Sequence, residues 1–312
     1  MKLTAAIDLY VLHRQATGEK FQSPFVALRA FARRYGAMPL SAITSADVKQ
    51  FLDGPRTGPA TWRRKYGTLR DFFAHWQCRG KLASLPLPLA VPKYTPTFVP
   101  YIYSRQELRL LLEAVPRCQR NAGCRISAAT LRTLLLLLYG TGMRVGEAIR
   151  LRLEDVDLDN SIITVRRTKF YKSRLVPLGK DVVQLLRQYM ATPGRRNQHY
   201  QPVFQSRLRR ALGHGGVEYS FRRLCSLAGV HRNDSGLRQP RLHDLRHTFA
   251  VHRLTEWYRN GADVQSLLPA LSTYLGHIDL RSTQCYLAMT PELLGEANRR
   301  FQDYVYGGRH EE

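Results

Sequence analysis

The sequence predicts a mostly α-helical protein of two domains that contains one small antiparallel β-sheet. Apolar residues recur at helical spacing through most of the chain. Five prolines crowd into residues 84–103, where fixed φ angles and missing backbone donors favour an extended linker. β-branched residues gather at 161–167 beside an apolar segment at 174–178, as expected for a hairpin. We therefore expect a helical domain at 1–83, a Pro-rich interdomain linker at 84–103 and a mixed α/β domain at 104–312.

The first domain is predicted to be a small helical bundle. Segments with helical spacing, separated by Gly and Pro, are expected as helices at Thr4–Gln15, Ser23–Tyr35, Thr44–Leu52 and Thr61–Arg79. The last of these segments mixes aromatic and basic residues, which we divide into an aromatic core face and a basic outer face. The basic face contains Arg63, Arg64, Lys65 and Arg70.

The second domain opens with a helix signal and contains the only predicted hairpin. Ser104 is followed three residues later by Glu107, which is the pattern of a capping box. A longer helix ends in Gly-Thr-Gly, and a short helix that carries Arg144 and Glu147 follows. The other predicted features are that longer helix at about 126–139, a hairpin tip at 168–173, and helices from 181 onward with loops near residues 194, 213 and 236.

Net charge is the abnormal feature of the composition. Lys and Arg total 48 against 24 Asp and Glu, which leaves a formal net charge of +24. Both halves are basic, with 15 basic and 5 acidic residues at 1–97 and 33 basic and 19 acidic residues at 98–312. Such an excess repels itself in a compact fold and is normally neutralised by a polyanion. Because Arg dominates and grips phosphate bidentately, we predict a nucleic-acid partner.

Several other classes of protein are not supported. The five cysteines form no CxxC pair, which argues against a disulfide framework or a zinc ribbon and suits a reducing cytosol. The N-terminus lacks the apolar run of a signal peptide, and the apolar segment 134–139 is far shorter than the roughly 20 residues that span a bilayer. No P-loop, zinc-spaced Cys/His set or acidic cluster is seen. We therefore expect no metal, no nucleotide cofactor, no membrane partner and a cytoplasmic location.

Three segments carry the chemistry: TGMRVGEAIRL at 141–151, RLHDLRHTFAVHRL at 241–254 and YLGHIDLRSTQCYLAM at 274–289. In this order and spacing they resemble the tyrosine recombinase (phage-integrase-like) family, with the size and layout of its Xer-like members. The resemblance covers about 104–300, the catalytic domain of the family. The first domain is similar to the family's core-binding domain in layout alone. The resemblance implies a bacterial or archaeal enzyme that breaks and rejoins double-stranded DNA through a 3′-phosphotyrosine intermediate.

Two arginines suit the chemistry of a phosphodiester. Its transition state gathers negative charge on the non-bridging oxygens, which two guanidinium forks can clamp and neutralise. Arg144 and Arg246 are the candidates for these forks. Glu147 lies three residues after Arg144, hence on the same helical face, and can orient its guanidinium.

The nucleophile is expected to be Tyr286. Among 16 tyrosines, only Tyr286 follows a Gly-His pair at the family's spacing, although Tyr274 and Tyr304 are nearby competitors. By resemblance, His277 of that pair hydrogen-bonds the scissile phosphate.

Two histidines lie beside Arg246 in the second motif. By resemblance, His243 helps to accept the nucleophile's proton, which an imidazole that titrates near neutrality can do. His247 is adjacent to Arg246, and we expect it to face elsewhere and to serve in packing.

A lysine at the hairpin tip is the expected general acid for the leaving 5′ oxygen. Aligned on the segment RLVPL at 174–178, the acid of the family falls on Lys169. The turn lacks the glycine usual in the family and has a second lysine three residues on, so Lys172 stays an alternative. Lys172 and Arg174 are also expected to contact DNA, together with the basic face of the first domain.

Strand exchange implies a larger assembly. By resemblance, the two domains grip opposite faces of one duplex, and four protomers form a ring on two duplexes. Residues 291–306 are predicted to form an amphipathic helix that docks on a neighbouring subunit, as a heterologous contact that closes a ring requires. A partner recombinase or an accessory protein is left open.

Three other functions fit parts of these observations. A type IB topoisomerase shares the tyrosine chemistry but relaxes supercoils alone and exchanges no strands. A catalytically silent DNA-binding regulator on the same fold is disfavoured because every expected catalytic position is filled. An RNA-binding protein is favoured by charge only.

Overall fold

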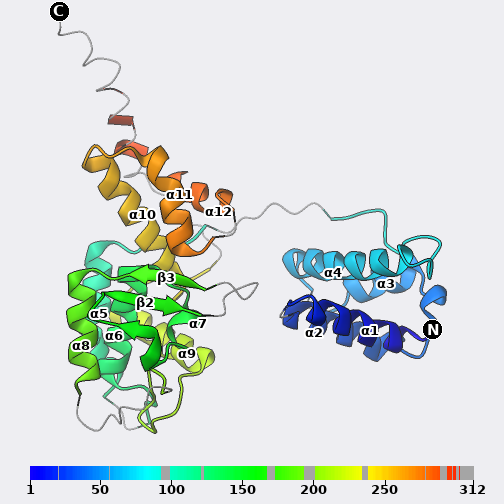
Figure 1. Cartoon of the computed structure of the whole chain (residues 1–312), viewed down its shortest axis with the longest axis horizontal. Coiled ribbons are helices and arrows are strands. Elements are labelled where there is room, and N and C mark those ends of the chain that lie inside the picture. Colours follow the sequence, from blue (N-terminus) through cyan, green and yellow to red (C-terminus); the bar gives the residue numbers. More distant parts are fainter. Residues whose placement is uncertain are drawn as a thin grey trace, which may run out of the picture. The chain divides into compact units, whose positions relative to one another are not determined.

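The computed structural model of the chain contains two compact units (Figure 1). The described residues are 1–19, 21–55, 57–92, 99–120, 123–166, 173–192, 201–233, 238–277, 279–288, 294–296, 298–299 and 302. Among them, the first unit lies within 1–92 and the second begins at 99. None of the helices in these ranges combines the length and hydropathy needed to cross a membrane.

The first unit is a helical bundle with an aromatic core. Its elements are α1 (Leu3–Ala16), α2 (Gln22–Tyr35), the 3₁₀ turn η1 (Leu40–Ala42), α3 (Ser45–Leu52) and α4 (Pro59–Gln77), so each predicted helix is confirmed to within two residues (Figure 1). Phe31, Phe72 and Phe73 are fully buried. The ring of Tyr10 packs edge to face on Phe72, with the centroids 5.4 Å apart. The bundle therefore places its aromatic rings inside and leaves the basic face of α4 outside.

The second unit packs helices against one face of a small antiparallel sheet (Figure 1). Before the sheet come α5 (Arg105–Cys118), α6 (Ala128–Thr141), α7 (Val145–Ala148) and the 3₁₀ turn η2 (Leu153–Asp155). The sheet contains β1 (Val156–Asp157), β2 (Ile162–Val165) and β3 (Arg174–Pro177). After it come α8 (Lys180–Met190), α9 (His214–Ala228), α10 (Asp244–Arg259), α11 (Val264–Leu275), α12 (Arg281–Gln284) and the 3₁₀ helix η4 (Cys285–Ala288).

The predicted hairpin is confirmed, and a third strand joins it. β2 pairs with β3 in a register that sets Val165 opposite Arg174 and Ile162 opposite Pro177. β1 pairs with the other edge of β2. β1 was not predicted, because two residues are too few to show the period-two pattern of a strand. The register matters because it brings Arg174 to one end of the sheet.

The described residues of the second unit form two hydrophobic clusters. The larger one joins α5, α6, α8, α9 and the inner face of the sheet, where Ile163, Val165 and Val176 are buried. The smaller one joins α10, α11 and η4 and includes Phe249, Leu275 and Tyr286 itself. α10 packs against α6 and α11, and α11 packs against β3, so the smaller cluster lies beside the sheet (Figure 1).

Both ends of the Pro-rich stretch pack against folded structure. On the N-terminal side, Leu85 and Leu87 lie against the core of the first unit. On the C-terminal side, Tyr103 is fully buried and its hydroxyl donates to the Arg241 carbonyl at 2.9 Å. The second unit therefore begins before α5, with Tyr103 in its core.

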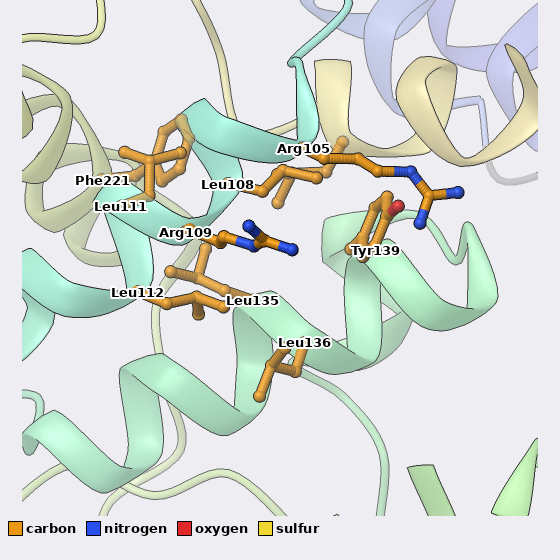
Figure 2. Close-up of a pocket in the computed structure, with 10 residues that line it drawn as sticks. Arg105, Leu108, Arg109, Leu111, Leu112, Leu135, Leu136, Tyr139 and Phe221 are labelled. Carbon is orange, nitrogen blue, oxygen red and sulfur yellow. The ribbon is translucent and has the colours of Figure 1, made fainter. Parts of the chain in front are cut away.

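An apolar cavity of about 200 Å³ lies between α5 and α6 (Figure 2). Leucines of the two helices line it together with Arg105, Arg109, Tyr139 and Phe221. None of the candidate catalytic residues that the structure describes lines this cavity.

Candidate active site

Residues from four separate segments converge on the C-terminal end of α11. Arg144 directly precedes α7, and Arg246 lies in the first turn of α10. His277 directly follows the residue that caps α11, and Tyr286 lies in η4. Arg144 and Arg246 are far from each other and from the 277–286 segment in the chain, so it is the tertiary fold that assembles the site.

Backbone carbonyls at two helix ends hold both arginines. Nη2 of Arg246 donates to the Leu275 carbonyl at 2.7 Å, and Nη2 of Arg144 donates to the Gly276 carbonyl at 2.8 Å. Nη1 of Arg246 donates to the Gly142 carbonyl at 2.8 Å. The last carbonyls of a helix have no partner within that helix and lie at the negative end of its dipole, so guanidinium groups satisfy them well. The two forks are thus oriented before any phosphate arrives.

Gly142 allows this close approach. It caps α6 in the left-handed conformation, with φ of 59°. A Cβ atom at this position would lie 2.5 Å from a ring carbon of Phe249 and 2.9 Å from a methyl carbon of Leu275. Glycine therefore lets α10 and α11 pack closely enough for Arg246 to reach the Gly142 carbonyl.

The two arginines differ in exposure. Arg246 is only 3% exposed, whereas the side chain of Arg144 is 39% exposed. Burial, followed by the nearby charge of Arg144, lowers the pKa of Arg246 to about 10, so the group is still protonated at neutral pH. Arg246 is therefore a buried positive charge beside Tyr286, and Arg144 is the more solvent-accessible of the two forks.

Glu147 orients Arg144, as its position three residues away suggests. One carboxylate oxygen accepts from Nη1 of Arg144 at 2.9 Å, and the other accepts from the Arg144 backbone N–H at 3.1 Å. Burial alone would raise the pKa of Glu147, but hydrogen bonds and the charge of Arg174, followed by the bonds from Arg144, lower it to about 2. Glu147 is therefore ionised at neutral pH.

Tyr286 lies against the arginines and is 2% exposed. Burial raises the pKa of its phenol, while the charge of Arg246 and a hydrogen bond from it, together with the charge of Arg144, act in the opposite direction. Its ring stacks on His277, with centroids 6.1 Å apart and planes inclined by 29°. The hydroxyl thus lies beside the guanidinium group that would hold a phosphate.

His277 is held by Thr283, which was not among the predicted site residues. Its Nδ1 is 2.7 Å from the hydroxyl oxygen of Thr283, which is fully buried. Burial and the charges of Arg246 and Arg144 lower the pKa of His277 to about 4. A neutral ring whose Nδ1 accepts from Thr283 would carry its proton on Nε2 and could donate it to a phosphate oxygen. No helical or strand spacing relates residues 277 and 283, so the sequence offered no signal for this contact.

His243 lies at the start of α10, and burial followed by the charge of Arg246 lowers its pKa to about 4. The ring is therefore neutral at neutral pH and has an unprotonated nitrogen. The expectation that His247 faces elsewhere is wrong. Its ring centroid lies 5.1 Å from that of His243 and 5.6 Å from that of Tyr286. Residues 243 and 247 are four apart, hence on one helical face, and this was the overlooked signal.

The competing Tyr274 is engaged elsewhere. Its hydroxyl donates to the Pro177 carbonyl at 3.3 Å, and its ring stacks on Phe249 with centroids 5.7 Å apart. Burial raises the pKa of its phenol to about 12. Tyr304, the other competitor, lies outside the described residues, as do Lys169 and Lys172.

Arg174 does not lie free on the surface, as a DNA contact would. Its side chain is 12% exposed and pairs with Glu147, with Nη2 2.8 Å from a carboxylate oxygen. The guanidinium group expected to contact DNA is thus held in an ion pair inside the protein.

The basic residues of α4 remain at the surface of the first unit. Arg63, Arg64 and Arg70 are exposed. Arg70 forms an ion pair with Asp71 at 2.9 Å. Lys65 is half-buried and donates to the Thr57 hydroxyl at 3.0 Å. Arg63 and Arg64 are thus the most available charges of this face.

Comparison with known proteins places the chain among recombinases. Residues 104–292 match the model of the phage integrase family. A protein of Sinorhizobium fredii (strain NBRC 101917 / NGR234), named an integrase/recombinase, is 35% identical over 95% of this chain and 96% of its own length. The tyrosine recombinase XerA of Thermococcus kodakarensis is 32% identical over 67% of this chain and 65% of its own.

Solved structures share the fold. The Tn1549 transposon integrase in complex with a circular intermediate DNA aligns with a TM-score of 0.68 at 17% identity, over 96% of this chain and 99% of that chain. The lambda integrase tetramer bound to a Holliday junction aligns with a TM-score of 0.66 at 19% identity, over 92% of this chain and 77% of that chain.

Proposed function

The chain belongs to the phage integrase family and is a recombinase that cuts and rejoins DNA, and we propose that Tyr286 is its nucleophile. One observation carries this assignment. The buried phenol of Tyr286 interacts with Arg246, and Arg246 and Arg144 donate to adjacent carbonyls at the end of α11. Nucleophilic attack on a phosphodiester requires a nucleophile, here the phenol, and oriented positive groups that bind the phosphate, here the two guanidinium forks.

The reaction follows from these positions. Arg144 and Arg246 bind the non-bridging oxygens, and His277 donates a hydrogen bond to the same phosphate. The Tyr286 oxygen attacks phosphorus while its proton passes to a neutral imidazole, for which His243 is the candidate. The bond from phosphorus to the 5′ oxygen breaks, and the 3′ end is left as a phosphotyrosine ester. The ester retains the bond energy, so a 5′ hydroxyl from a partner strand can reverse the step without a nucleotide cofactor.

Lys169 supplies the proton to the leaving 5′ oxygen in this scheme, with Lys172 as the alternative. A substrate whose leaving group is a 5′ bridging sulfur separates the two, because a thiolate leaves without a proton. Lys169→Ala is expected to cut this substrate at the wild-type rate while failing on normal DNA. If the sulfur substrate restores cleavage by Lys172→Ala instead, Lys172 is the general acid.

Recombination of two duplexes is proposed to use four protomers, with residues 291–306 docking on a neighbouring subunit. The lambda integrase tetramer on a Holliday junction, which shares the fold, supports this assembly. Deletion of the residues after 290 is expected to weaken synapsis more than binding to a single site. Equal losses, measured by gel shift with one-site and two-site DNA, would contradict it.

A nicked suicide duplex tests the function. The wild-type chain is expected to form a covalent complex, and Tyr286→Phe is expected to form none while it binds DNA with nearly unchanged affinity. A two-site plasmid then separates recombinant products from the topoisomers that a type IB topoisomerase alone would make. The absence of any covalent complex would favour the silent DNA-binding regulator.

A further inference from the structure

A third arginine is built into the active site. Nη1 and Nη2 of Arg174 donate to the two carboxylate oxygens of Glu147 at 3.1 and 2.8 Å, and its Nε donates to the Tyr274 carbonyl at 3.0 Å. A parallel pair of bonds between guanidinium and carboxylate is strong and specific in geometry. Most of the N–H donors of Arg174 are therefore engaged inside the protein.

The end of α11 receives three arginines in succession. Three consecutive carbonyl oxygens each accept from a different guanidinium: Tyr274 from Arg174 at 3.0 Å, Leu275 from Arg246 at 2.7 Å and Gly276 from Arg144 at 2.8 Å. Arg174 is thus the third arginine bound to this helix end, beside the two arginines that are proposed to bind the phosphate. The same helix end leads directly into His277.

Arg174 also lies flat against the turn before His277. Gly276 adopts the left-handed conformation with φ of 69°, and a Cβ atom there would lie 2.9 Å from Nη1 and 3.0 Å from Cζ of Arg174. The absence of a side chain at 276 lets the guanidinium reach the Tyr274 carbonyl and Glu147 together. Arg174 therefore touches both structures that orient the phosphate-binding groups.

Direct contact of Arg174 with DNA would be costly. The Glu147 side chain is 6% exposed, so a swing of Arg174 toward phosphate would leave a buried carboxylate without its bidentate partner. That carboxylate would be free to turn its second oxygen toward the Arg144 guanidinium group. It would then compete with phosphate for the N–H donors of Arg144. In the present arrangement, the guanidinium group of Arg144 donates to Glu147 through Nη1.

We propose that Arg174 is a positioning residue of the recombinase, which holds Glu147 and the turn at 274–277 so that Arg144 and His277 face the phosphate. This role rests on the proposed function. Arg174 acts through Glu147 and the α11 end, and it contributes no phosphate contact of its own.

The test compares Arg174→Gln with Arg166→Gln. Arg166 flanks the same hairpin and also pairs with a carboxylate, that of Asp155 at 2.5 Å, but its side chain is 56% exposed. We expect Arg174→Gln to slow covalent-complex formation on the suicide duplex by about 10- to 100-fold, as displaced supporting groups do. The salt dependence of duplex binding is expected to stay at the wild-type slope in both variants. Arg174→Lys, which keeps the charge and loses the fork, is expected to give an intermediate rate.

A double-mutant cycle of Arg174→Gln with Glu147→Gln tests whether Arg174 affects cleavage through Glu147. Because Arg174 acts in part through Glu147, the double variant should be less impaired than the product of the two single effects predicts, and fully multiplicative effects would contradict this route. Thermal unfolding of each variant identifies any that fails to fold. If Arg174→Gln fails to fold, the cleavage rate of Arg174→Lys is compared with that of Arg166→Gln instead.

The outcomes separate this role from the function itself. A wild-type chain that forms no covalent complex overturns the proposed function. A wild-type chain that cuts, together with Arg174→Gln cutting at the rate of Arg166→Gln, overturns the positioning role. A salt slope that falls by about one in Arg174→Gln also overturns it, since that is the signature of a lost phosphate contact.

Discussion

The active site and the basic face of α4 both present arginines, but they hold them in opposite ways. In the active site, Arg246 is 3% exposed and donates to two backbone carbonyls. On α4, Arg63 and Arg64 are exposed, and their side chains can change conformation to contact a DNA backbone. Chemistry on a phosphate needs donors that are oriented before the reaction, whereas a grip on DNA needs only charge nearby. Changes in the two regions should therefore alter different measurable quantities.

The largest difference should come from Arg246. Replacement by lysine keeps the charge but cannot reach both Gly142 and Leu275 carbonyls, so single-turnover cleavage should slow by about 10²- to 10³-fold. Arg253→Lys is the control, since Arg253 lies on the same helix, is 43% exposed and pairs with Glu256. Equal rates for the two variants would show that the fork geometry of Arg246 is not needed.

The buried histidines should make the second unit acid-sensitive. Burial and nearby arginines lower the pKa of His243 and His277 to about 4 and that of His247, with His243 as a further cause, to about 3. The unfolded chain, with ordinary histidine pKa values of about 6.5, binds more protons between about pH 4 and 6.5. Stability is therefore complete above about pH 6.5 and is lost as the pH falls through this window.

Urea unfolding at a series of pH values checks this prediction. The free energy of unfolding should fall by at least about 1.4 kcal/mol between pH 6.5 and 4.5, and His247→Gln should flatten the decline. His231→Gln, which replaces an exposed histidine of the same unit, should leave the decline unchanged. A flat wild-type profile would mean that these imidazoles are not held neutral.

A smaller effect is expected on α4, and in affinity rather than in rate. Arg63→Ala and Arg64→Ala should each reduce the slope of log affinity against log salt by about one for each lost phosphate contact. Cleavage at saturating DNA should keep its rate. Lys49→Ala is the control, because Lys49 is exposed but pairs with Asp53 at 2.8 Å. A slower cleavage step in either arginine variant would contradict the division of labour between the two regions.

The smallest effect is expected at Gly67, for which Gly142 provides the contrast. Gly67 lies in the middle of α4, and nothing lies within 4 Å of a Cβ atom added there, so Gly67→Ala should stabilise the first unit by about 0.5–1 kcal/mol. Gly142→Ala should destabilise the second unit, because its Cβ atom would lie 2.5 Å from Phe249. Calorimetry of both variants checks the pair, and a stabilising Gly142→Ala would refute the close packing at the α6 end.

Local signals account for what the sequence could predict of the fold. Ser104 and Glu107 form the expected capping box, and the hairpin of β2 and β3 lies where β-branched residues gather. The motif residues Arg144, Arg246, His277 and Tyr286 could be named because their spacing resembles a known family, and the structure brings all four together.

Long-range contacts account for what the sequence could not predict. The pairing of Arg174 with Glu147 spans 27 residues, and its bond to the Tyr274 carbonyl spans 100. No local pattern distinguishes a buried arginine of this kind from an exposed one on the same strand. The ring contact between His247 and Tyr286 depends likewise on how η4 returns to α10.

Peptide mapping of the trapped complex tests most directly that Tyr286 is the nucleophile. After trypsin, the peptide 282–299 contains Tyr286 as its single tyrosine, whereas Tyr274 falls in 260–281 and Tyr304 in 301–309. The nucleotide remnant is expected on 282–299, at residue 286. A remnant on either of the other two peptides would contradict the account.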